Sequence, residues 1–110
     1  DIGKALYMAI SDVLPQMERR GVILITDGDT AEKDFKAYSA DIIIDYAKSH
    51  FIPVYILTLK TKSPLLMRIA NETGGAIYKG SELDGLRTVY DAIKNSNDYR
   101  YVLLYHTFKI

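Results

Sequence analysis

The chain has 110 residues, no cysteine, and fourteen basic side chains against fourteen acidic ones. A chain of this length forms one globular unit with a sizeable core, and without cysteine it can hold no disulfide, thiolate metal site or thiol nucleophile. Balanced charge argues against a nucleic-acid partner and against direct membrane contact, because both surfaces usually need an excess of Lys and Arg. We therefore expect neither partner.

In the first half of the chain, segments with apolar residues at helical spacing alternate with apolar segments typical of strands. Apolar residues recur at helical spacing from Ile2 onwards, and Pro15 is expected to end or kink that helix. A buried strand is predicted at residues 22–26, a second helix at 38–47, and a second buried strand at 53–58.

The same alternation continues in the second half. Ser63 and Pro64 form an N-cap followed by proline at the first helical position, and the helix is expected to stop at the glycine pair 74–75. A short strand at 76–78 and a helix opened by the capping-box-like SELD motif follow. This regular order predicts an α/β fold with a parallel sheet and right-handed crossovers.

An acidic turn follows the first strand. Asp27, Gly28 and Asp29 come directly after the apolar run VILIT, and the carboxyl ends of parallel strands are where α/β proteins place their binding and catalytic groups. The two carboxylates could hold a cation, carry a phosphoryl group, or cap the next segment.

The first strand has only one clear parallel partner, residues 54–58, although such apolar strands normally have a neighbour on each side. We therefore expect a free edge, which invites pairing with another chain and makes self-association through this edge strand a candidate property. The terminal segment YRYVLLYHTF carries apolar residues on both faces. It either pairs with the sheet or leads into a further domain.

Several motifs in this order resemble the von Willebrand factor type A domain. They are ILITDG, a helix ending in YAK, PVYIL, RIANETGG, AIY and SELDGLRTVYDAI. The likeness extends from Ile2 to Asn95 and aligns with the second half of that domain, while DYRYVLLYHT is similar to the tail of many bacterial members. We therefore expect 1–110 to be a single partial domain, with 1–95 as the family region and 99–110 as a terminal tyrosine-rich strand.

The resemblance implies a three-layer α/β/α fold with a doubly wound, mainly parallel, Rossmann-like sheet. It also implies a metal-ion-dependent adhesion site that binds Mg²⁺ or another divalent cation at the carboxyl edge of the sheet, where a protein partner docks. Of the family's ligands, only the Asp of the T-D-G turn is present, as Asp27. The Asp-x-Ser-x-Ser turn is absent, and the family's Thr would stand one position before Asp1.

We thus expect a piece of a non-enzymatic, adhesion-type binding module that lacks its N-terminal strands, and this absence would also explain the free edge. A single carboxylate binds Mg²⁺ weakly, so cation dependence is expected of the complete domain. The compartment stays open; a bacterial extracytoplasmic or membrane-anchored protein is one reading.

An enzymatic alternative is a Mg²⁺-dependent phosphatase similar to the haloacid dehalogenases, with Asp27 as nucleophile and Asp29 as acid/base. Here Ala31 stands where that pattern has Thr or Val, and no paired acidic loop follows the later strand; Lys60 or Lys62 would be its lysine.

The two histidines are weaker candidates for a site. His50 is expected to serve a helix end, and His106 has no spaced ligand mate for zinc.

Overall fold

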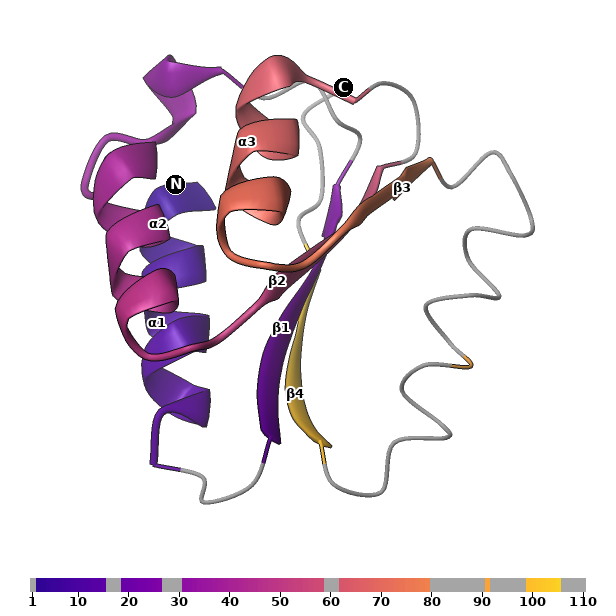
Figure 1. The fold of residues 1–110 in the computed structure, drawn as a ribbon. Coiled ribbons are helices and arrows are strands. Elements are labelled where there is room, and N and C mark those ends of the chain that lie inside the picture. Colours follow the sequence, from indigo (N-terminus) through magenta and orange to yellow (C-terminus); the bar gives the residue numbers. More distant parts are fainter. Residues whose placement is uncertain are drawn as a thin grey trace.

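The chain folds around a four-stranded sheet in a computed structural model that describes residues 2–15, 19–26, 31–58, 62–79, 91 and 99–105. The strand order is β3-β2-β1-β4, and every neighbouring pair is parallel (Figure 1). The prediction of an α/β fold with a parallel sheet is confirmed. The elements are α1 (Ile2–Val13), β1 (Arg19–Thr26), the 3₁₀ turn η1 (Glu32–Asp34), α2 (Ala40–Ser49), β2 (Val54–Thr58), α3 (Pro64–Glu72), β3 (Ile77–Lys79) and β4 (Tyr99–Tyr105).

The three α-helices lie side by side on one face of the sheet, with α2 between α1 and α3 (Figure 1). Val22 and Leu24 of β1 belong to the core that these helices cover. Since side chains alternate along a strand, Ile23 points to the opposite face, and it is buried there as well, with 2% of its surface exposed. Leu57 of β2 is likewise only 3% exposed. Both faces of the central strands therefore carry buried side chains, as is usual in parallel sheets.

The predicted end of α1 and both predicted ends of α3 are confirmed, whereas α2 begins and ends two residues later than the predicted 38–47. α1 ends at Val13, two residues before Pro15. Ser63 accepts a hydrogen bond from the Leu66 amide at 3.1 Å, and Pro64 is the first residue of α3. The helix predicted after the SELD motif lies outside the described residues, apart from Asp91.

The expectation of a free edge beside β1 was wrong. β4 pairs with β1 in parallel from Arg19 opposite Tyr99 to Ile25 opposite Tyr105. The terminal segment therefore pairs with the sheet, and self-association through this edge of β1 loses its basis. The physical reason is that this edge of β1 offers unpaired backbone N–H and C=O groups, and a parallel apolar strand satisfies them.

The glycine pair after α3 has two separate structural roles. Gly74 has a φ of 85°, and its N–H donates to the Asn71 carbonyl at 3.3 Å. The Gly75 N–H donates to the Ala70 carbonyl at 2.9 Å, which completes a Schellman motif with Gly74 in the left-handed position. A Cβ on Gly75 would lie 1.9 Å from the carbonyl oxygen of Val54, whereas one on Gly74 would meet nothing within 4 Å.

α2 ends in the same motif, but with a phenylalanine in the left-handed position. The Phe51 N–H donates to the Lys48 carbonyl at 3.2 Å, and the Ile52 N–H donates to the Ala47 carbonyl at 2.9 Å. Phe51 has a φ of 57°, which is unfavourable for a residue with a Cβ. Its side chain is 87% exposed, so packing within the chain does not offset that strain.

We predict that Gly75→Ala lowers the free energy of unfolding by about 3 kcal/mol or more, because the new methyl group overlaps backbone atoms of β2. Gly74→Ala is the matched control. It introduces only the left-handed strain, which costs about 1 kcal/mol. Urea denaturation of the two variants measures the difference, and equal losses would contradict the close approach of Gly75 to Val54.

At position 51, as at position 74, glycine should be better tolerated than alanine. Phe51→Gly is expected to be more stable than Phe51→Ala by about 1 kcal/mol, because both variants remove the exposed ring and only glycine relieves the positive φ. Thermal or urea unfolding tests this, and an alanine variant as stable as the glycine variant would show that residue 51 is not held in the left-handed region in solution.

Candidate functional site

The candidate site is the carboxyl edge of the sheet, where the acidic turn leaves β1. Thr26 is the last residue of β1, and its register partner on β2 is Thr58, which in turn pairs with Lys79 at the end of β3. Both threonines are fully buried, and Thr58 Oγ1 donates to the Tyr78 carbonyl at 3.4 Å. Asp27, the predicted metal ligand, lies just beyond Thr26 and outside the described residues.

The segment after the acidic turn is anchored by two residues. The Asp34 carboxylate accepts a hydrogen bond from the Ala31 amide at 2.9 Å, while the Asp34 amide donates to the Ala31 carbonyl at 2.9 Å. Phe35 is 7% exposed and belongs to the helix-facing core. The chain is thus fixed to the core a few residues after the turn.

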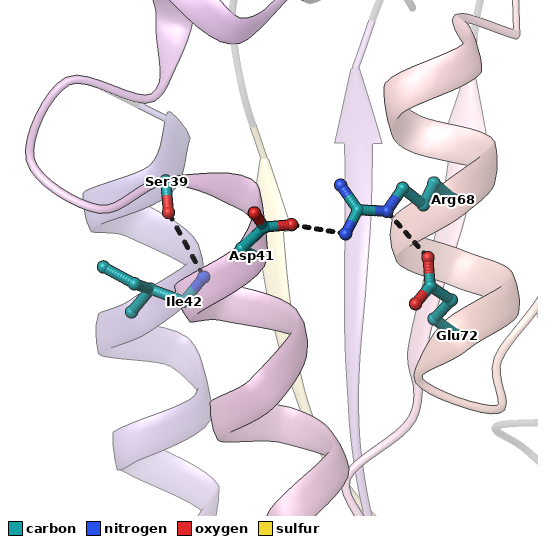
Figure 2. Close-up of polar contacts among 5 residues, drawn as sticks. All are labelled: Ser39, Asp41, Ile42, Arg68 and Glu72. Carbon is teal, nitrogen blue, oxygen red and sulfur yellow. Dashed lines mark hydrogen bonds and ion pairs between the residues drawn. The ribbon is translucent and has the colours of Figure 1, made fainter.

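A pocket of about 310 Å³ opens between the amino-terminal end of α2 and the middle of α3. It is lined by Phe35, Ser39, Ala40, Asp41 and Arg68. Ser39 caps α2 by accepting a hydrogen bond from the Ile42 amide at 3.3 Å (Figure 2). The pocket lining thus combines an aromatic ring and a methyl group with charged side chains.

The charged side chains belong to an ion-pair chain that joins the two helices. Arg68 Nη2 donates to Asp41 Oδ1 on α2, and Arg68 Nε donates to Glu72 Oε2 at 2.7 Å on its own helix (Figure 2). The hydrogen bonds to Asp41 and then to Glu72 raise the pKa of the guanidinium above its already high value. Arg68 therefore stays charged throughout the accessible pH range, and these exposed pairs orient the side chain more than they stabilise the fold.

A stack of aromatic rings ties α1 to α2. The rings of Tyr7 and Tyr38 are stacked with centroids 4.0 Å apart, and Tyr7 and Tyr46 with centroids 4.6 Å apart. Ser11 Oγ lies 2.9 Å from the Tyr46 hydroxyl, and His50 Nδ1 lies 2.9 Å from the Tyr46 carbonyl oxygen. The expectation that His50 serves a helix end is confirmed. His106 lies outside the described residues.

The roles of Phe35 and Arg68 in this region were not predicted from the sequence. Phe35 is the lone bulky apolar residue in the polar stretch AEKDFKAYS, which was a signal for an anchor. Arg68 and Glu72 stand four residues apart, a spacing that favours an ion pair on a helix. The contact of Arg68 with Asp41 had no such signal, because it depends on how α2 and α3 pack.

In the described part of the chain, no group of three or more His, Asp or Glu residues is placed to hold a metal ion. Asp27 and Asp29 lie outside the described residues, so the cation site and the phosphatase pair both stay predictions. None of the helices in the described ranges combines the length and apolar character of a membrane span.

No family model matches the sequence, and no curated protein matches it. Among solved structures, the fold is similar to that of an uncharacterized membrane-spanning protein from Vibrio fischeri, with a TM-score of 0.54 and 20% sequence identity. The alignment covers 88% of this chain and 56% of the other. This likeness shows the fold alone, and the chain spans little more than half of that protein.

Proposed function

We propose that the chain is the C-terminal half of a von Willebrand factor A-like domain, a non-enzymatic module that binds a protein partner through Mg²⁺. The observation that supports this is the position of the T-D-G motif. It begins at Thr26, the last residue of β1, and β1 has a parallel neighbour on each side in the sheet. That is the place where open α/β sheets bind ligands.

The proposal includes a doubly wound, three-layer architecture. The burial of Ile23 and Leu57 on the face opposite the three described helices supports a covering layer there. The match to only part of the Vibrio fischeri structure fits a chain that belongs to a longer protein. Because that structure is described as membrane-spanning, our proposal also has this chain anchored to a membrane through another part of the same protein.

In the proposed complete domain, Asp27 supplies one ligand of an octahedral Mg²⁺ shell. Mg²⁺ takes six oxygen ligands and is commonly held by one or two carboxylates, with hydroxyls and waters completing the shell. The remaining protein ligands would come from a strand that carries the Asp-x-Ser-x-Ser turn. β4 lies along the edge of β1 that the family gives to this strand, so the proposal requires that strand to take the place of β4 in the complete domain.

The phosphatase alternative is less well supported. Its chemistry needs a second acidic pair near Asp27 to help hold the Mg²⁺ ion. The strands beside β1 are β2 and β4, and neither the residues that follow β2 (59–62) nor those that follow β4 (106–108) include a carboxylate.

The test is Mg²⁺ titration of the longest natural chain that contains these residues, by calorimetry. Asp27→Ala is expected to lower Mg²⁺ affinity by more than about tenfold, since even indirect changes at metal sites cost that much. Asp29→Ala is the matched control, one residue away from Asp27, and should bind Mg²⁺ as the unchanged protein does.

Two outcomes would overturn the proposal. One is Mg²⁺ affinity that Asp27→Ala leaves unchanged. The other is Mg²⁺-dependent hydrolysis of p-nitrophenyl phosphate that is lost in both the Asp27→Ala and Asp29→Ala variants, which would establish the phosphatase.

A further inference from the structure

We propose that copies of this chain associate with each other, and that Phe51 of one copy enters the pocket between α2 and α3 of another. This contact is separate from the proposed cation site and does not depend on it. It joins two different surfaces of the molecule: the exposed ring at the carboxyl end of α2 and the pocket at the amino end of the same helix.

Phe51 is unusual both in its backbone conformation and in its exposure to solvent. Its backbone has a φ of 57° at a position where α3 uses Gly74, and its side chain is 87% exposed. Strained residues persist where the surroundings or a function require them, and large exposed aromatic rings are typical anchors of protein interfaces. The ring gains its packing only when another molecule covers it.

The pocket suits an aromatic side chain. Phe35 and Ala40 give it an apolar lining, and its volume of about 310 Å³ leaves room for one ring. Arg68 also lines the pocket, and its guanidinium is held by Asp41 and Glu72 (Figure 2). A planar cation beside an entering ring adds a cation–π contact to the apolar burial.

One pair of opposite charges, Lys48 near the ring and Asp41 at the pocket, favours a second copy as the occupant. Lys48 is exposed in the last turn of α2, next to Phe51, while Asp41 is 71% exposed in the first turn, at the rim of the pocket. When Phe51 enters the pocket of another copy, Lys48 approaches Asp41. The negative carboxyl end of one α2 also approaches the positive amino end of the other.

The ring and its pocket cannot meet within one molecule. α2 has ten residues, so its ends stand about 15 Å apart. The contact must therefore pair the ring of one copy with the pocket of a different copy.

Sedimentation equilibrium of the chain from micromolar to millimolar concentration tests this contact. The average mass should rise with concentration, and Phe51→Gly should lower the association constant by about thirtyfold or more, which is the size of a hot-spot loss. Loss of folding does not confound this variant, because glycine relieves the positive φ. The control is Met8→Ser, which removes another exposed apolar side chain, on α1, and should leave association unchanged.

A charge swap tests the orientation. Asp41→Lys and Lys48→Glu should each weaken self-association by about tenfold, since each places like charges together. An equimolar mixture of the two variants should recover it, because the pocket rim of one variant and the α2 carboxyl end of the other then carry opposite charges again.

Three outcomes would overturn the proposal: a chain that stays monomeric at every concentration, association that Phe51→Gly leaves intact, or variants that do not recover on mixing. Phe51-dependent binding of a monomeric chain to vesicles of phosphatidylserine would assign the ring to a lipid surface instead.

Discussion

The burial of β1 between two parallel neighbours is the constraint on which the rest of the structure depends. Val22 and Leu24 pack beneath the helices, and Ile23 is buried on the other face of the sheet. β2 and β4 pair with β1 on its two sides. Because the strand is withdrawn from water, its backbone groups must find partners within the sheet. β2 and β4 meet this requirement as parallel neighbours, so their carboxyl ends lie at the edge of the sheet where the acidic turn begins.

Elements with short-range signals could be predicted from the sequence. Ser63, Pro64 and Gly74 mark the two ends of α3 by their own backbone preferences, and the structure follows them. The place of β4 had no such signal, because pairing Ile25 with Tyr105 joins distant parts of the chain. An apolar pattern on both faces predicts a strand in a covered sheet, but it does not show which other strand it pairs with.

The candidate site likewise combines features with a local sequence signal and features that depend on long-range packing. The sequence placed the acidic turn at the end of a strand, because an apolar run followed by carboxylates is a local pattern. The pocket could not be foreseen, since it arises from the packing of α2 against α3 and from the contact between Asp41 and Arg68. Phe51 was also missed as a helix end, because the left-handed position usually has glycine.

One hydrogen bond links the end of α3 to the beginning of β2. The Val54 amide donates to Thr73 Oγ1 at 3.0 Å, and this hydroxyl donates in turn to the Ile69 carbonyl at 2.8 Å in the last turn of α3. If that turn frays, the first amide of β2 loses its acceptor inside the core. The last turn of the helix and the first residue of the strand therefore open and close as one cooperative unit, and hydrogen exchange at Val54 reports the opening of a helix to which it does not belong.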